Sequence, residues 1–352
     1  MDLGVIEGFY GPLWSWDERE ALIARLAPHG YRFYHYAPKG DPAVRERWRT
    51  PWPDETAERL RAFAASCRAA GLRFGAGIAP LELSSRAGGP AWRALEERLA
   101  QLDAVGIDEL VLLFDDVRGD TPDLAGEQAR IADFAAARTA AARMLVCPTY
   151  YSDDPLLDRL YGERPADYLE TLGRRLDEAI GVFWTGEEIC AREITTGHIE
   201  RVTEALRRPP VLWDNYPVND SPRMARHLHL RAFTGRAPGL DAALAGHAIN
   251  PALQPALSAI PALTLPARYR EGEGYEYMRA FRAAAREVLG EALARMVEAD
   301  LTLLEDAGLD RLGEEHARLR ARYAAIDHPA AREIVRWLDG GYQPGAGAPC
   351  AG

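Results

Sequence analysis

Residues 111–117, VLLFDDV, place two adjacent carboxylates directly after a run of apolar side chains. The run LVLLF, residues 110–114, has the continuous apolar character of a strand buried on both faces, as in parallel sheets. Asp115 and Asp116 would then lie at the rim of a core, where desolvation and mutual repulsion push two carboxyl pKa values apart. An ionised acid beside a protonated one suits acid–base chemistry. The pair alone also fits a helix N-cap, a solvated turn or the ligands of a hard cation.

Strand-like runs and helical spacing alternate on both sides of this stretch. The extended runs lie near residues 3–7, 31–36, 72–78, 109–114, 143–147, 180–184, 210–213 and 244–249. Between them the apolar residues recur at helical spacing, as in 54–70 with Leu60, Phe63 and Cys67 on one face. Strands interleaved with helices at a spacing of about 35 residues predict an α/β fold with a closed (β/α)8 barrel, the TIM barrel. An open doubly wound sheet is the alternative, but no glycine-rich phosphate turn follows the first strand.

The chain changes character after the eighth strand. Residues 251–268 are rich in proline and alanine and predict a connector. One long helix is expected over 275–306, followed by shorter helices near 310–325 and 329–338. The apolar face of the long helix would carry Tyr277, Phe281, Ala284 and Val288. The predicted domains are a catalytic barrel over 1–268, a small helical domain over 269–340 and a flexible tail over 341–352.

Composition excludes several classes of protein. The chain has 352 residues and a net charge of −11, and no local basic stripe offsets that charge, so no nucleic-acid partner is expected. No apolar run is long enough to span a bilayer, and the first residues show no secretory leader. The scattered cysteines have neither metal spacing nor a disulfide pattern, so no metal, no cofactor and a reducing, cytoplasmic location are expected. Their positions are Cys67, Cys147, Cys190 and Cys350.

Polar and aromatic residues gather where the predicted strands end. In a (β/α)8 barrel these positions converge on one face, and the chemistry lies there. The segments are 7–11 (EGFYG), 36–39 (YAPK), 115–116 (DD), 147–151 (CPTYY), 184–186 (WTG), 213–220 (WDNYPVND) and Asn250. Lys39 is the only lysine in the chain, beside 41 arginines, so its compact ammonium is a candidate for a role that a guanidinium does not fill. Carboxylates, amides and aromatic faces together suit a sugar ligand.

These segments also resemble a known family. The motifs GVIEGFYG (4–11), YAPKGD (36–41), LLFDDV (112–117), CPTYY (147–151), FWTGEE (183–188), WDNYPVND (213–220) and the Asn250-Pro251 turn are similar to glycoside hydrolase family 84. This is the family of O-GlcNAcases and β-N-acetylglucosaminidases. The resemblance covers residues 4 to about 251 in order, and it implies a retaining enzyme that uses the substrate's own 2-acetamido group as nucleophile, through an oxazoline.

The resemblance also implies a role for each matching residue. Asp115 would accept the acetamido N–H, and Asp116 would protonate the leaving oxygen and then activate water. Both reach one sugar only if the chain leaves strand geometry there, because successive strand residues face opposite sides. The remaining positions imply substrate binding. Tyr151 would bind the acetamido oxygen, Gly8 and Lys39 the 3-hydroxyl, Asp220 and Asn250 the 4- and 6-hydroxyls, and Trp213 and Asn215 the acetamido end.

Several alternatives stay open. The substrate would be terminal β-linked GlcNAc on a glycoconjugate, including O-GlcNAc protein or peptide, but a hyaluronan- or glycan-chain hexosaminidase uses the same site, and a catalytically silent GlcNAc-binding module needs the same contacts. Trp184 and Trp213 each fit either the site or the core, Asp214 fits a structural cap, and His35 fits a satisfied interior histidine. In relatives a helical stalk pairs between protomers, so a homodimer through the helical domain is expected.

Two departures from the family pattern leave parts of the pocket undefined. After the third strand relatives usually have a Ser-Pro-Gly turn, whereas this chain has IAPLEL at 78–83. Tyr150 directly precedes Tyr151, which makes the tyrosine assignment ambiguous.

Overall fold

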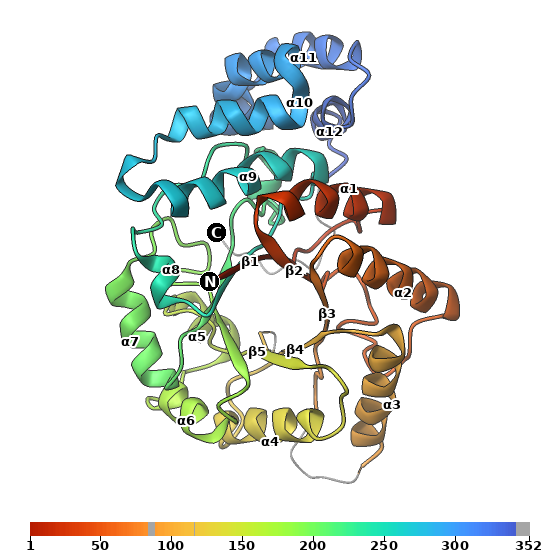
Figure 1. Cartoon of the computed structure of the whole chain (residues 1–352), viewed down its shortest axis with the longest axis vertical. Helices are drawn as coiled ribbons and strands as arrows, with labels where there is room; N and C mark the ends of the chain where they lie inside the picture. Colours follow the sequence, from red (N-terminus) through yellow and green to blue (C-terminus); the bar gives the residue numbers. More distant parts are fainter. Residues whose placement is uncertain (84–88, 116, 343–352) are drawn as a thin grey trace.

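The computed structural model describes residues 1–83, 89–115 and 117–342. Its centre is a closed barrel of parallel strands in which each strand pairs with the next in the chain and β8 pairs with β1 (Figure 1). The strands are β1 Asp2–Glu7, β2 Tyr31–Tyr36, β3 Arg73–Ile78, β4 Glu109–Leu113, β5 Arg143–Cys147, β6 Gly181–Trp184, β7 Val211–Asp214 and β8 Gly246–Ile249. The predicted (β/α)8 barrel is confirmed, and each observed strand lies within two residues of its expected limits.

Helices form a ring outside the strands, and a further group lies on one side of the barrel, beyond α9 (Figure 1). The helices are α1 Trp16–Leu26, α2 Asp54–Ala69, α3 Pro90–Val105, α4 Leu124–Ala136, α5 Pro155–Tyr161, α6 Tyr168–Arg175, α7 Thr196–Leu206, α8 Leu240–Ala243, α9 Pro255–Glu271, α10 Tyr277–Leu301, α11 Glu315–Ala324 and α12 Pro329–Leu338. The long helix expected over 275–306 is broken at Gly290, which has non-helical backbone angles, and continues after α10 as a π-helical turn, η4, over Thr302–Ala307.

The prediction of a connector over 251–268 is wrong, because most of this segment forms helix α9. Proline inside a helix removes the amide that would bond the carbonyl four residues earlier. For Pro266 that carbonyl belongs to Ala262, and the hydroxyl of Tyr31 donates to it at 2.8 Å. The helix is buried along most of its length, with Ile260 and Leu265 fully enclosed. Burial and this substitute donor therefore outweigh the proline content.

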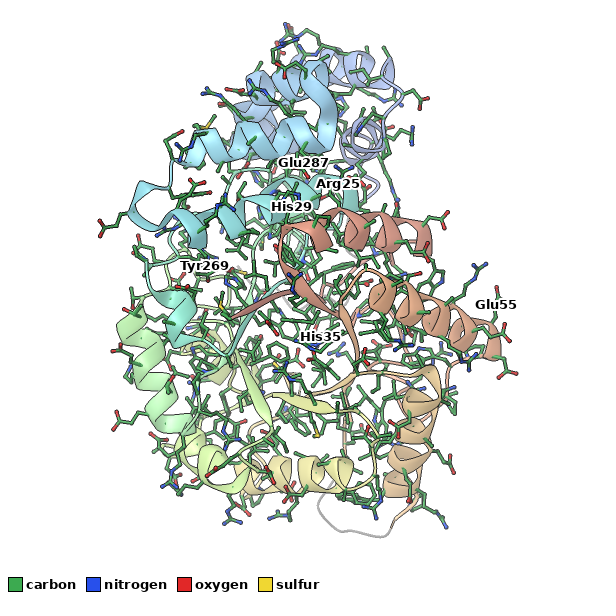
Figure 2. The ribbon with its side chains drawn as sticks, in the orientation of Figure 1. Arg25, His29, His35, Glu55, Tyr269 and Glu287 are labelled. Carbon is green, nitrogen blue, oxygen red and sulfur yellow. The ribbon has the colours of Figure 1, made fainter. Side chains whose placement is uncertain are left out.

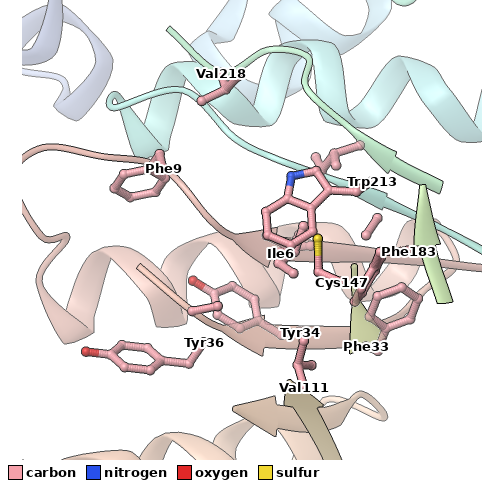
Figure 3. Packing of buried hydrophobic residues seen from close by; sticks show 14 of the residues in the cluster. Ile6, Phe9, Phe33, Tyr34, Tyr36, Val111, Cys147, Phe183, Trp213 and Val218 are labelled. Carbon is pink, nitrogen blue, oxygen red and sulfur yellow. The ribbon is translucent and has the colours of Figure 1, made fainter. Parts of the chain in front are cut away.

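The core fills the barrel and the space between strands and helices. Ile6, Phe33, Val111 and Phe183 are among its buried members (Figure 3). A polar pair lies within this core: the imidazole of His35 contacts Glu109 at 2.5 Å, and both residues are almost fully buried. This interaction holds the pKa of Glu109 at about 2, since pairing with His35 and Arg73 outweighs the effect of burial. His35 is therefore an interior histidine as expected, but it is satisfied only in part, because its buried Nδ1 has no hydrogen-bond partner among the described residues.

The C-terminal helices pack on the flank of the barrel rather than standing apart from it. Phe281, Ala284 and Val288, on the predicted apolar face of α10, are buried within the chain. Polar contacts add to this packing where α1 meets α10: His29 contacts the Glu287 carboxylate at 2.7 Å, and Arg25 donates to the Glu287 carbonyl at 3.0 Å (Figure 2). The domain limits at 268 and 340 stay predictions, and the predicted tail lies almost entirely outside the described residues.

Over its described residues, the chain has no helix long and apolar enough to cross a membrane.

Candidate active site

A cavity opens where the strands end, as expected for this fold. It has about 720 Å³ of space not occupied by atoms, part of it open to solvent. All the described residues that the sequence assigned to the site line it. They are Gly8, Lys39, Asp115, Tyr151, Trp213, Asn215, Asp220 and Asn250. These residues follow or end strands β1, β2, β4, β5, β7 and β8, so closure of the barrel brings together positions far apart in sequence.

Asp115 and Lys39 form an ion pair at the bottom of the cavity. Strand β4 ends at Leu113, and Asp115 lies in the turn that follows, so the chain has left strand geometry before the acid pair. The backbone of Lys39 donates to the carbonyl of Phe9 at 3.0 Å, which joins the loops after β2 and β1. Only 2% of the lysine side chain is exposed. The single lysine of the chain is thus a buried partner of the first acid and not a surface residue.

Asp116 lies outside the described residues. Its predicted role as proton donor therefore stays a prediction.

A hydrogen-bonded chain of side chains orients the wall formed by β7 and β8. The indole of Trp213 donates to the side-chain oxygen of Asn215 at 3.0 Å, and the amide of Asn250 donates to the same oxygen at 2.9 Å. The side-chain oxygen of Asn250 in turn accepts the backbone N–H of Gly8 at 3.2 Å. The amide of Asn215 donates to the carbonyl of Ile189 at 2.8 Å. Each of these side chains is held in place by a hydrogen bond to another residue, so the wall is preorganised.

Gly8 is required by the approach of Trp213. A Cβ atom at position 8 would lie 2.2 Å from the tryptophan ring, a distance that real atoms do not tolerate. The ring therefore packs against bare backbone, and a side chain at position 8 would push it into the cavity.

The two adjacent tyrosines have different places. Tyr151 lines the cavity, whereas Tyr150 is fully buried and donates its hydroxyl to the carbonyl of Gly162 at 2.5 Å. Of the two tyrosines, Tyr151 is therefore the one placed to meet a molecule in the cavity, and its contact with the acetamido oxygen stays a prediction.

Asp220 is a partly buried carboxyl that reaches the cavity from the loop after β7. It accepts the backbone N–H of Tyr10 at 2.8 Å. Burial raises the pKa of Asp220 to about 6, and the bonds from Tyr10 and the charge of Lys39 oppose this rise. With a pKa of about 6, this carboxyl can take the protonated form, which donates a hydrogen bond, or the ionised form, which only accepts. Both forms can bond to the hydroxyls of a sugar.

Trp184, which the sequence left open between site and core, and Asp214, expected to be a structural cap, both lie outside the cavity. Trp184 is fully buried and donates to the imidazole of His198 at 2.9 Å, so of the two tryptophans only Trp213 reaches the cavity. Asp214 pairs with Arg236 and His247. Burial alone would raise the pKa of Asp214, but these two partners lower it below its usual value. Asp214 therefore holds the end of β7 in place.

Sequence reasoning missed part of the lining. Tyr10, Cys147 and Thr185 lie inside motifs that were singled out, so their positions at strand ends were an available signal. Three others come from helix α5 and the loop after β7, where no strand-end signal exists; these are Leu160, Tyr161 and Met224. The divergent segment 78–83 contributes none of the described lining residues.

Cys190 also lines the cavity, and burial raises the pKa of its thiol to about 12. Among the described residues, no group of three or more His, Cys, Asp or Glu is placed to hold a metal ion.

Comparison with known proteins gives consistent results. A family model described as beta-N-acetylglucosaminidase matches residues 3–304. The chain is 31% identical over 259 residues to protein O-GlcNAcase of Mus musculus and equally to that of Rattus norvegicus. Each match covers 70% of this chain but only 28% of the relative, so the chain corresponds to less than a third of those proteins.

A solved structure extends the similarity to the whole fold. A mutant of the O-GlcNAc hydrolase of Thermobaculum terrenum superposes with a TM-score of 0.79 at 28% sequence identity. The match covers 96% of this chain and 80% of that one, so it includes the C-terminal helices as well as the barrel.

Proposed function

The chain belongs to the β-N-acetylglucosaminidase family, glycoside hydrolase family 84, and from this membership we propose that it removes terminal β-linked GlcNAc from a glycoconjugate with retention of configuration. One observation carries the proposal. The described residues to which the resemblance gives a catalytic or binding role, drawn from both halves of the barrel, line a single cavity around the Asp115–Lys39 pair.

We propose a substrate-assisted reaction in this cavity. The acetamido oxygen of the substrate attacks the anomeric carbon while the bond to the leaving oxygen breaks, and Asp116 gives that oxygen its proton. Asp115 accepts the acetamido N–H and balances the positive charge on the resulting oxazoline. Water then attacks the same carbon, Asp116 takes its proton, and the ring reopens to GlcNAc. The buried ammonium of Lys39 supports this division, because it supplies the positive charge that an ionised carboxylate at Asp115 needs in a buried site.

The remaining lining residues would bind the sugar. Tyr151 would contact the acetamido oxygen, and Trp213 with Asn215 would enclose the acetamido end. Gly8 and Lys39 would hold the 3-hydroxyl, and Asp220 and Asn250 the 4- and 6-hydroxyls. The fixed orientation of Trp213, Asn215 and Asn250 supports these roles, since a preorganised wall loses little entropy when a ligand binds.

The test is turnover of an aryl β-GlcNAc compared with the matching aryl β-glucoside, which lacks the acetamido nucleophile. We expect release of the aryl group from the first substrate only. Equal release from both would contradict the substrate-assisted mechanism. Tight GlcNAc binding without any release would leave a silent sugar-binding module.

We further propose that the natural substrate is an O-GlcNAc protein or peptide and that the enzyme acts in the cytoplasm. The names of the rodent relatives support the substrate, and the free thiols of Cys67 and Cys190 support a reducing compartment. Release of GlcNAc from an O-GlcNAc peptide, measured beside release from a hyaluronan oligosaccharide, separates the two substrate classes. A location outside the cytoplasm in a fractionation experiment would contradict the second proposal.

A homodimer through the C-terminal helices is also proposed. The apolar face of α10 gives it no support, because Phe281, Ala284 and Val288 are already covered within the chain. A dimer would therefore have to use the exposed sides of these helices.

A further inference from the structure

The loop that follows β7 carries Asn215 and Asp220 into the cavity and then returns along the C-terminal helices before α8 begins at Leu240. Its returning arm, residues 227–231, rests on the π-helical turn η4. The carboxylate of Glu305 in this turn accepts the backbone N–H groups of Leu230 and Arg231, each at 3.1 Å. The Glu305 side chain is only 12% exposed, so these two bonds form in a largely dry environment.

Backbone contacts reinforce the same junction. The N–H of Leu228 donates to the carbonyl of Leu304 at 3.1 Å, and the imidazole of His227 contacts the carbonyl of Glu305 at 2.8 Å. A Cβ at Gly308 would lie 2.5 Å from the ring of His227, so the two segments are in close contact. The returning arm is thus fitted to η4 and its neighbours along several consecutive residues.

The returning arm is also tied to the arm that bears Asp220. The side-chain amide of Asn219 donates to the carbonyl of His227 at 2.9 Å. The imidazole of His229 contacts the carbonyl of Pro217 at 3.0 Å. Asn219 directly precedes Asp220, so a continuous set of contacts leads from η4, through the returning arm, to the carboxyl in the cavity.

We propose that Glu305 is a positioning residue for sugar binding, which holds the Asp220 loop in its binding conformation from outside the barrel. The physical reason is that two backbone N–H groups of the returning arm lose their acceptor when this carboxyl is removed, and buried donors without an acceptor are costly. The returning arm would then be held less tightly on η4, and the position of Asp220 would be less well fixed. This inference rests on the proposed function, in which Asp220 binds sugar hydroxyls.

The experiment compares Glu305→Ala with Asp300→Ala, a matched control in the same helical region. Asp300 is also a buried carboxylate, but it accepts the hydroxyl of Tyr323 at 2.7 Å and pairs with Arg322, both in α11. Neither of these partners belongs to the Asp220 loop. We expect both substitutions to lower Tm. Only Glu305→Ala should raise KM for the aryl β-GlcNAc and the Kd for free GlcNAc, by about tenfold, with kcat changed less.

A double-mutant cycle with Asp220→Asn tests whether Glu305 affects sugar binding through Asp220. If Glu305 acts through Asp220, Glu305→Ala adds little further loss once Asp220 has been replaced. One oxygen of Glu305 accepts both N–H groups, so Glu305→Gln should keep a KM near that of the wild type, whereas Glu305→Met, of similar size but without an acceptor oxygen, serves as the variant if the alanine protein does not fold. An unchanged KM and Kd in Glu305→Ala or Glu305→Met, full additivity with Asp220→Asn, or an equal KM rise in Asp300→Ala would each overturn the proposal.

Absence of turnover in the wild type would contradict the proposed hydrolase function alone. The Kd for GlcNAc, measured on the same set of proteins, would still decide the role of Glu305.

Discussion

The proposed division of roles between Asp115 and Asp116 can be measured. Asp116→Asn should slow release of poor leaving groups by several orders of magnitude but affect activated aryl groups much less, since these need little protonation. Asp115→Asn should impair both, because the oxazoline forms with every leaving group. The measurement is kcat/KM for a series of aryl β-GlcNAc substrates of different leaving-group pKa. Equal dependence on leaving group in the two variants would contradict the assignment.

Lys39 provides a second test at the level of one side chain. Lys39→Arg keeps the charge but replaces a compact ammonium by a wide planar group in a space where 2% of the side chain is exposed. We expect kcat/KM to fall by at least about tenfold, or about 1.4 kcal/mol. A rise in KM is expected from loss of the 3-hydroxyl contact, with kcat lowered as well where the pair with Asp115 is disturbed. Wild-type kinetics would show that the site tolerates any cation here.

Single residues were predictable from the sequence where the backbone itself brings them to the site. Trp213 and Asn250 are at strand ends, and closure of the barrel places all strand ends around one opening. Tyr161 and Met224 were not predictable in this way, because a helix and a long loop place them. The contact between Gly8 and Trp213 could not be predicted either, because the packing of a ring on a distant backbone segment produces no recognisable pattern in the sequence.

At the level of elements, the C-terminal helices complete the barrel by supplying a cap that α9 lacks. Gln254, at the N-cap of α9, makes no capping bond with its side chain. Instead Glu333, from α12, accepts the N–H groups of Ala256 and Leu257 at 2.8 and 2.9 Å. Sequence patterns describe caps from adjacent residues, so a cap from a distant helix could not be predicted. The proline-rich segment was misassigned for the same reason, because Tyr31 supplies its substitute donor from β2.

The carboxyl of Glu333 makes the stability of the fold depend on pH, and the direction of this dependence follows from its pKa. Burial raises the pKa of Glu333 to about 8, against the effect of the two N–H donors, while the unfolded chain titrates near the ordinary value of about 4.3. Between these values the folded protein binds a proton that the unfolded chain has released, so the stability due to this group falls as pH rises through the window. Below about pH 4 the contribution is complete, and above about pH 8 it is lost.

Glu333→Gln removes this titration. We expect the free energy of unfolding of the wild type to fall more steeply than that of the variant between about pH 5 and pH 8, by up to a few kcal/mol. Urea unfolding of both proteins across this range provides the measurement. The difference between the two curves isolates Glu333 from Asp220 and Glu305, which are present in both. Parallel curves would show that the carboxyl does not titrate in this window.

For the whole molecule, the proposed homodimer has a direct test. Light scattering of the full chain at micromolar concentration should give twice the mass of one chain. Removal of residues 270–352 is not a suitable control, because it would delete Glu305 and Glu333 together with their contacts to the barrel. A single-chain mass at all concentrations would contradict the dimer and leave α10–α12 with their role on the barrel flank.

Lysine and arginine are distributed unevenly between the cavity and the rest of the protein. The only lysine is buried in the cavity, and all other cationic side chains of this kind are arginine. A reagent that acylates lysine amines therefore finds no such target on the outside of the folded protein. Covalent labelling at Lys39 would report the opening of the cavity, and a bound sugar would shield it, so a mass spectrum could record occupancy of the site without any turnover.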